Sequence, residues 1–305
     1  MILACGEALI DMLPRKSEAG EDAFAPYAGG AVFNTAIALG RLGAPVGFFS
    51  GIAGDFLGDI LQNVLRDSGV DTALIHVSEK PSTVAFVKLV DGQATYAFYD
   101  ENTAGRMLSE ADLPTTIDAE ALFFGGISLV VEPCGATYEA LMAREAGSKV
   151  TMLDPNIRPG FIRDEAAYRA RIERMIGMAD IVKLSDEDLL WLEGEGDLAD
   201  RARGLLAKGV KLVCITEGAE GATGYTASET VHVPANKVTV VDTVGAGDTF
   251  NAGVLAALHE RGCLTKERVA ALGAEDIRAA LELGVKAAAV TVSRAGANPP
   301  RRDEL

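Results

Sequence analysis

The stretch of sequence that decides the fold runs Val240-Val241-Asp242-Thr243-Val244-Gly245-Ala246-Gly247-Asp248-Thr249-Phe250. The apolar run from Val238 to Val241 predicts a buried strand, and the apolar spacing after Asp248 predicts a helix. Gly245 and Gly247 lie in the turn between them, where the lack of a side chain lets the backbone approach a ligand. Such a turn is an anion site, because unpaired N–H groups and the positive end of the helix dipole converge there.

An acid at the mouth of an anion site is unusual, since a carboxylate competes with a bound phosphate. Asp248 could take a proton from the group that attacks the phosphate. It could equally be the N-cap of the helix, a common use of aspartate. This fragment alone leaves both interpretations open. If Asp248 is a base, we expect the helix dipole to lower its pKa and make it a weak base that acts late.

Composition limits the possible partners. The chain has 305 residues, 49% of them hydrophobic and 24% charged, which is typical of a globular protein with a sizeable core. A net charge of −16 argues against nucleic acid or an anionic membrane as a partner, but not against an anionic small molecule. The chain has no apolar run near the ~20 residues of a membrane span.

The four cysteines are scattered and the three histidines lie far apart. This pattern favours reduced, mostly buried thiols over a disulfide or zinc framework, and it makes a histidine-built metal site improbable. The sequence therefore predicts a cytoplasmic protein.

From Leu122 onward, apolar runs alternate with helical patterns up to Thr216. This rhythm predicts an α/β fold with a doubly wound, mostly parallel sheet and helices on both faces. Ligands of such folds lie beyond the C-terminal ends of the strands. The segments expected at those ends are Gly125-Gly126, Asp154-Pro155-Asn156-Ile157-Arg158, Lys183-Leu184-Ser185 and Thr216-Glu217-Gly218.

The N-terminal part begins with a short strand, Met1 to Ala4, followed by two acids, Glu7 and Asp11. These acids could accept hydrogen bonds from a polyol, or they could mark a solvated strand end. Residues 14–28 look irregular or like an edge segment. A helix is predicted from Gly29 to Leu39, and on it the amide of Asn34 needs a partner, either a ligand or a backbone carbonyl.

Residues 83–90 and 93–99 are β-like runs joined by Asp91-Gly92, a dipeptide that favours a type I′ hairpin turn. An antiparallel hairpin beside a parallel sheet is expected to act as a flap over a site. The alanine-rich part at 265–292 is predicted to be helical. No linker or repeat divides the chain, so we expect one domain over residues 1–305, with a β lid from about 12–28 and 80–102.

Several of the predicted strand ends suit phosphoryl transfer, which depends on positioning and on charge neutralisation. Arg158 could offer a bidentate fork to a transferring phosphate. The acidic run Ser185-Asp186-Glu187-Asp188 could hold Mg²⁺ through water, but the spacing of Ser185 and Asp188 fits a helix capping box better. Neither a Walker-type loop nor a GxGxxG turn after a strand is present.

The string from Asp242 to Phe250 resembles the C-terminal signature of the ribokinase/PfkB family of sugar kinases. The family's N-terminal signature is also matched. The residues that resemble it are Gly29-Gly30 with Asn34, followed by Gly51-Ile52-Ala53-Gly54-Asp55 and Gly58. The segments 154–159, 183–185, 215–218 and 294–297 fall in the family's order, so the resemblance covers essentially the whole chain. It implies a ribokinase-like three-layer α/β/α fold with a small β lid at the 91–92 hairpin.

The resemblance also implies roles for individual residues. Asp248 would be the base, and the amides of Gly245, Ala246 and Gly247 would bind the γ-phosphoryl group of ATP. The sugar would contact Asp11, Gly29, Gly30, Asn34, Phe98 and Arg158, with Arg158 also reaching the phosphate. The nucleotide would lie near Lys183, Ser185, Thr216, Gly218 and Gly221. Asp242 and Val244, with the 288–296 region, would lie where some members bind a monovalent cation such as K⁺. Because the lids of family members often pair, the resemblance also implies a homodimer.

One position departs from the family. Its metal-associated Asn-x-x-Glu appears here as Ser185-Asp186-Glu187-Asp188, which leaves Mg²⁺ binding by Asp188 open.

Residues 7–11 and 98–104 look most like bacterial fructokinases, so the expected reaction is ATP-dependent phosphorylation of a primary hydroxyl of a ketohexose, fructose first. The alternatives are a 2-keto-3-deoxygluconate kinase, a ribokinase or a nucleoside kinase. A non-catalytic sugar-binding protein is the alternative of another class, against which the intact Gly-Ala-Gly turn and Asp248 argue.

Overall fold

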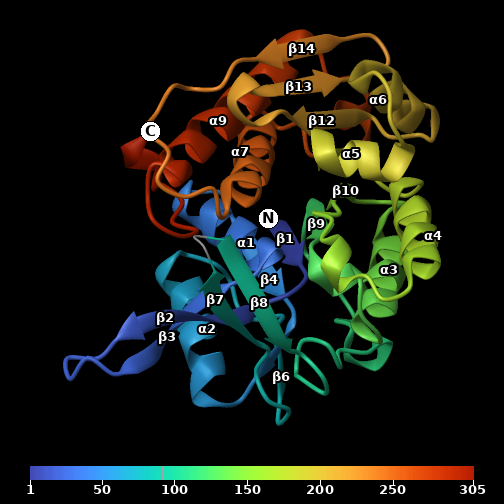
Figure 1. The fold of residues 1–305 in the computed structure, drawn as a ribbon. Coiled ribbons are helices and arrows are strands. Elements are labelled where there is room, and N and C mark those ends of the chain that lie inside the picture. Colours follow the sequence, from blue (N-terminus) through green and yellow to red (C-terminus); the bar gives the residue numbers. More distant parts are fainter. Residues whose placement is uncertain (91–92) are drawn as a thin grey trace.

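The apolar runs of the sequence form the strands of one eight-stranded sheet with the order β14-β13-β12-β11-β10-β9-β1-β4 (Figure 1). In the computed structural model, the backbone of residues 1–90 and 93–305 and the side chains of 1–87 and 97–305 are described. From β12 to β4 neighbouring strands are parallel, whereas β13 and β14 are antiparallel additions. The strands are β1 (Ile2–Cys5), β4 (Val46–Phe49), β9 (Ala121–Gly125), β10 (Val150–Asp154), β11 (Ile181–Ser185), β12 (Leu212–Thr216), β13 (Ala222–Tyr225) and β14 (Thr230–Val233).

Helices cover both faces of this sheet, because alternate residues of a strand point to opposite sides. On β1, Ile2 and Ala4 belong to one buried cluster, and Leu3 and Cys5 belong to the other. The first cluster is covered by α1 (Ala31–Arg41), α2 (Phe56–Asp67), α7 (Ala246–Glu260), α8 (Lys266–Ala270) and α9 (Ala274–Val292). The second is covered by α3 (Cys134–Glu145), α4 (Glu165–Ile176), α5 (Asp186–Glu193) and α6 (Leu198–Ala207). The predicted doubly wound α/β fold is confirmed.

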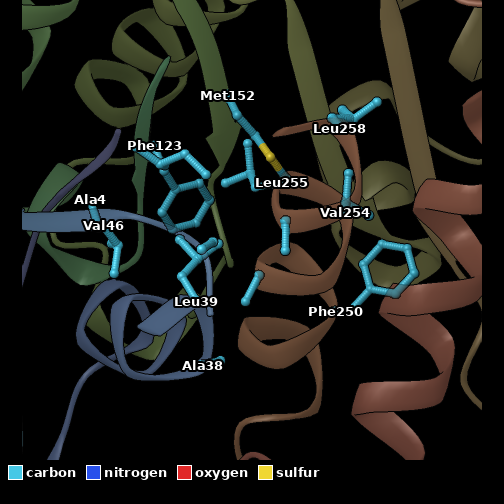
Figure 2. Close-up of a cluster of buried hydrophobic side chains, with 14 of the residues drawn as sticks. Ala4, Ala38, Leu39, Val46, Phe123, Met152, Phe250, Val254, Leu255 and Leu258 are labelled. Carbon is cyan, nitrogen blue, oxygen red and sulfur yellow. The ribbon is translucent and has the colours of Figure 1, made fainter. Parts of the chain in front are cut away.

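The packing of α1 and α7 on the sheet positions the candidate site. Figure 2 shows Phe123 and Met152 of the sheet facing Leu39 of α1 and Leu255 of α7. Their burial fixes the two helices side by side, so that their N-terminal ends lie at the same edge of the sheet, where β10 and β11 end.

A second, four-stranded sheet has the order β3-β2-β7-β8. Its strands are β2 (Leu9–Lys16), β3 (Asp22–Gly29), β7 (Val84–Val90) and β8 (Gln93–Tyr99). Strands β7 and β8 pair antiparallel, as the hairpin prediction requires, and the predicted turn at 91–92 lies outside the described residues. Figure 1 shows this sheet on the side of the molecule away from β13 and β14. A short parallel pair, β5 (Gly51–Ala53) with β6 (His76–Ser78), lies next to α2.

Residues 14–16 and 22–28 lie in β2 and in β3, and β3 is an edge strand that accommodates Pro26, in agreement with the edge-segment expectation. Two other details differ from the expectations. Val238 to Val241 form no strand, and Val238, Val240 and Val241 are 41%, 60% and 60% exposed. The amide of Val241 instead donates to the carbonyl of Val292 at the end of α9, at 2.8 Å. The 265–292 part is two helices, α8 and α9, with Gly273 as the N-cap of α9.

Among the described residues, no helix combines the length and apolarity that crossing a membrane requires. The cysteines Cys5, Cys134, Cys214 and Cys263 are free and buried, as predicted.

Candidate active site

The turn that opens α7 has Gly245 as its N-cap, in the left-handed region at φ 78°. A Cβ on Gly245 would also lie 2.7 Å from the Cβ of Ala297, so a glycine is required there for two reasons. Ala246 donates a long backbone hydrogen bond of 3.3 Å to Thr243, and the following amides belong to the first helical turn, whose donors have no intrahelical acceptor. The N-terminus of α7 therefore offers backbone donors to an anion.

Asp248 is the third residue of α7 and is only 6% exposed. It does not cap the helix, so the N-cap interpretation is wrong. Its carboxylate accepts a hydrogen bond from the Asn34 amide at 2.9 Å (Oδ2) and a long one from the Asn156 amide at 3.5 Å (Oδ1). The Asn34 amide thus binds a side-chain carboxylate. The sequence had suggested a ligand or a backbone carbonyl instead.

Burial raises the pKa of Asp248 to about 7. The hydrogen bond from Asn34 and the charge of Lys183 oppose this rise, whereas the charges of Asp154 and Glu7 add to it. The expectation that the helix dipole lowers this pKa is wrong, because loss of hydration outweighs the dipole. Asp248 is therefore a stronger base than the sequence indicated.

Lys183 lies beneath this turn. Its Nζ atom is 3.1 Å from Oδ2 of Asp154, and the amide of Asn251 donates to the same oxygen at 2.6 Å. A Cβ on Gly247 would lie 3.0 Å from Lys183 Nζ, so the ammonium group packs against the turn itself. Sequence analysis missed Asn251, although its place three residues after Asp248, on the same side of a helix, was a usable signal.

Asp11 and the glycine pair form a second part of the site. Asp11 lies on β2, and burial raises the pKa of its carboxyl group to about 6. A Cβ on Gly29 would be 2.5 Å from Oδ2 of Asp11. Gly30 has φ 112°, and its Cβ would be 2.9 Å from the carbonyl oxygen of Glu7. Both glycines leave room for the acids beside them.

Glu7 is half-buried. Its carboxylate accepts the amide of Ala31 at 2.8 Å and that of Ser128 at 3.3 Å. These amides lie at the starts of α1 and of the 3-10 helix η2 (Ile127–Leu129), so Glu7 caps both segments. Burial raises the pKa of Glu7.

The loop after β10 carries Asn156, Arg158 and Phe161. Asn156 adopts φ 45°, a conformation that few residues other than glycine tolerate, and this turns its amide toward Asp248. Arg158 is exposed and forms no ion pair with any described residue; its Nη1 donates to the carbonyl of Ile157 at 3.0 Å. Phe161 packs edge-on against Phe98 of β8 with ring centroids 4.2 Å apart. Phe161 was not identified from the sequence.

The acidic run begins α5, as the capping interpretation predicted. The hydroxyl of Ser185 accepts the amide of Asp188 at 3.0 Å. The Asp188 carboxylate does not close a capping box; it accepts the amide of Ile157 at 3.1 Å and so ties α5 to the Arg158 loop. Burial raises the pKa of Asp188, with the neighbouring charge of Asp154 adding to the rise. Within the described residues no three acids, cysteines or histidines gather into a metal site.

Thr216 ends β12 and is followed by the 3-10 helix η4 (Gly218–Glu220). Gly218 has φ 54°, and Gly221 has φ 114° with the carbonyl oxygen of Val233 only 2.1 Å from a would-be Cβ. These glycines shape the loop beside β12.

Asp242 ties the turn before α7 to the C-terminal loop. Its carboxylate accepts the amides of Val244 at 3.1 Å and Gly296 at 2.9 Å. Val244 is 47% exposed.

Arg158, Ser185 and Thr216 lie at or just after the C-terminal ends of three parallel strands, where α/β folds bind ligands. Asp248, Asn34, Asn156, Lys183 and Asp154 form one connected group.

Known proteins resemble this chain along nearly its whole length. A family model described as pfkB family carbohydrate kinase matches residues 1–304. A fructokinase of Rhizobium leguminosarum bv. trifolii is 61% identical over 279 residues, covering 91% of this chain and 86% of that protein.

Two crystal structures share the fold. A fructokinase from Xylella fastidiosa with bound ATP has a TM-score of 0.89 and 29% identity, covering 97% of this chain and 93% of that one. A fructokinase from Vibrio cholerae O395 in a form with fructose, ADP and calcium bound has a TM-score of 0.83 and 26% identity, covering 97% and 94%.

Proposed function

Because the chain belongs to the pfkB family of carbohydrate kinases, we propose that it is an ATP-dependent fructokinase. It transfers the γ-phosphoryl group of ATP to a primary hydroxyl of fructose. The observation that carries the chemistry is the buried carboxylate of Asp248 in the first turn of α7, directly beside the glycine turn. The choice of fructose rests on the similarity to the Rhizobium and Vibrio fructokinases.

In the proposed reaction, Asp248 takes the proton of the sugar hydroxyl as its oxygen attacks the γ-phosphorus. The bond from the γ-phosphorus to the bridging oxygen breaks, and ADP leaves with the electron pair. A base with a pKa of about 7 suits this proton transfer at neutral pH. The amides of Ala246 and Gly247, after the Gly245 turn, neutralise charge on the phosphoryl oxygens.

We assign the sugar to the space between the two sheets. Asp11 would accept sugar hydroxyls, Asn34 would hold the sugar against Asp248, and Gly29 and Gly30 would let it approach the backbone. Phe98 and Phe161 would close the pocket, with Arg158 reaching the phosphate. We also propose a homodimer. Three aromatic side chains of the four-stranded sheet are exposed and would be covered by a second copy: Phe24, Tyr27 and Tyr99.

The nucleotide would lie along Thr216, Gly218 and Gly221, near Ser185. Mg²⁺ commonly binds one or two carboxylates while its other ligands are phosphates and water. Among the described residues there is no cluster of three metal-binding side chains, and Asp188 as a single carboxylate ligand of Mg²⁺ agrees with this preference. When bound, the ion would neutralise phosphate charge. A K⁺ site at Asp242 and Val244 also stays a proposal.

The charges near Asp248 favour fructose over a keto acid. A sugar acid requires a cation for its carboxylate. Lys183 is paired with Asp154, and the proposal assigns Arg158 to the phosphate, so neither of these two cations is left for that carboxylate.

A coupled assay of ADP release tests the function. We expect fructose to give the highest kcat/KM in a panel with ribose, 2-keto-3-deoxygluconate and a nucleoside, at fixed ATP and Mg²⁺. Omitting the sugar gives the baseline hydrolysis. A higher kcat/KM for another acceptor would replace fructose. Sugar binding by calorimetry without ADP release from any acceptor would support the non-catalytic alternative.

A further inference from the structure

An ion pair lies buried under the glycine turn, between the ends of two parallel strands. Asp154 is the last residue of β10 and Lys183 lies inside β11, and they are 1% and 4% exposed. Asn251 of α7 donates to the same Asp154 oxygen that Lys183 contacts. Sheet and helix thus hold the Asp154 carboxylate from two sides, and that carboxylate pairs with the ammonium group.

The ammonium group faces the reacting end of α7. Its Nζ atom lies 3.0 Å from the position of a Cβ on Gly247, so a side chain there would require the ammonium group to shift by a few tenths of an ångström. The acids that act on its charge come from three elements: Asp154 from β10, Asp188 from α5 and Asp248 from α7. Asp248 in turn also faces Glu7, and Arg158 acts on Asp188 from the loop after β10.

Stability alone does not account for this arrangement. Removing two charges from water costs several kcal/mol for each ion, and replacing a buried pair with apolar residues is often neutral or stabilising. Lys183 is 4% exposed and its ammonium group is paired with Asp154, which argues against the direct contact with the nucleotide that the family resemblance implied. A fixed positive charge beside a phosphoryl-binding turn does have a use, since it acts where negative charge develops.

We propose, on the basis of the fructokinase function above, that Lys183 is a positioning residue for phosphoryl transfer. Paired with Asp154, whose carboxylate Asn251 also holds, it keeps a positive charge under the Gly247 turn and favours the ionised form of Asp248. It acts through the turn and the base, without touching the sugar.

The test is Lys183→Met, assayed by ADP release from fructose and ATP between pH 5 and 9. We expect kcat to fall about tenfold to hundredfold, less than the roughly 10²- to 10³-fold loss for a donor that touches the reacting group, because Lys183 acts through the turn. KM for fructose should change little. Loss of the cation favours the neutral form of Asp248, so the acidic limb of the kcat/KM profile should move to higher pH. An unchanged limb would overturn the proposal. A raised KM for ATP with normal kcat would instead make Lys183 a nucleotide ligand.

A structural defect must be separated from an electrostatic one, because Lys183→Met leaves Asp154 buried and unpaired. The double variant Lys183→Met/Asp154→Asn removes both charges and should recover thermal stability but not turnover. Recovery of normal turnover and a normal pH profile would show a purely structural role and overturn the proposal.

Lys266 provides the matched control, since its Nζ forms an ion pair of 2.6 Å with Asp180 at the opposite ends of the same strands. Lys266→Met should lose stability and keep the wild-type profile. If the wild-type protein releases no ADP with any sugar, the fructokinase function fails by itself, whatever the variants do.

Discussion

At the scale of single residues, the environment of Asp248 decides its chemistry. A helix N-terminus favours an ionised carboxylate, but its field is weaker than the cost of removing the charge from water. The result is a carboxyl group with a pKa of about 7, held by Asn34 and Asn156. Only the three-dimensional surroundings reveal this balance.

The raised pKa predicts the pH dependence of turnover. The base must be ionised, so kcat/KM for fructose should rise with pH and level off above about pH 7. Asp248→Asn should lower kcat by about 10²- to 10⁴-fold at pH 8, the usual contribution of a general base. ADP release over pH 5 to 9 measures both. A profile that stays flat between pH 5.5 and 8, or full turnover in the variant, would contradict the base assignment.

The same pKa predicts an effect on stability. The folded state binds the Asp248 proton more tightly than the unfolded state, whose ordinary value is 3.8, so this group's contribution to stability falls as pH rises from about 4 to 7. Asp248→Asn removes that penalty. We therefore expect a higher Tm for the variant than for the wild type at pH 8, and equal values near pH 4. Thermal unfolding followed by circular dichroism measures this. A lower Tm for the variant at pH 8 would show that the carboxylate stabilises the fold.

At the scale of elements, the pairing of β2 with β3 places Gly29 of β3 directly beside the carboxylate of Asp11 on β2. Gly29 pairs with Leu9 in the ladder, and its Cα faces Oδ2 of Asp11. A methyl group at Gly29 would lie 2.5 Å from that oxygen, which is closer than the two atoms can approach. The pairing of these strands therefore fixes where a carboxylate can stand in the proposed sugar site.

Gly29→Ala should displace the Asp11 carboxylate without changing the helix that follows. We expect KM for fructose to rise about tenfold, the loss of about one hydrogen bond to a charged group, with a small change in KM for ATP. Gly147→Ala is the control, because no atom lies within 4 Å of its would-be Cβ. Steady-state kinetics with each substrate varied decides the matter, and an unchanged KM for fructose would remove Asp11 from the sugar site.

Elements with strong local signals were predictable from the sequence. The parallel strands and the hairpin of β7 and β8 followed from apolar runs and turn residues, and Ser185 from a capping pattern. The run from Val238 to Val241 was misassigned, because an apolar pattern does not show where the backbone hydrogen bonds go; here the amides of Val241 and Asp242 donate to the carbonyl of Val292. The partners of Asn34 and Lys183, and the Phe98–Phe161 contact, join segments far apart in the chain and leave no local pattern.

At the scale of the whole molecule, the four-stranded sheet and the eight-stranded sheet meet around the proposed sugar site. The contact of Phe98 with Phe161 joins the outer sheet to the loop after β10. This link supports the proposed lid, which would exclude water from the phosphoryl group.

Replacing residues 83–99 by a short glycine-serine linker tests the lid. We expect either hydrolysis of ATP without sugar to increase or affinity for fructose to be lost, while ATP affinity measured by calorimetry stays near normal. Phe161→Ala, which keeps the hairpin, should shift the same quantities in the same direction by a smaller amount. Normal values for both hydrolysis and fructose affinity in the linker variant would rule out a lid.

The order of the strands also bears on how the protein is made. β1 lies between β4 and β9, and the Asn34 amide meets the Asp248 carboxylate across 214 residues of chain. At ~5–20 residues per second, a ribosome needs about 10 to 40 seconds between these two residues. During that time the N-terminal segments lack their contacts with α7, and chaperones and proteases can bind them. The catalytic group is thus completed among the last parts of the molecule, and no nascent chain that lacks α7 has the base.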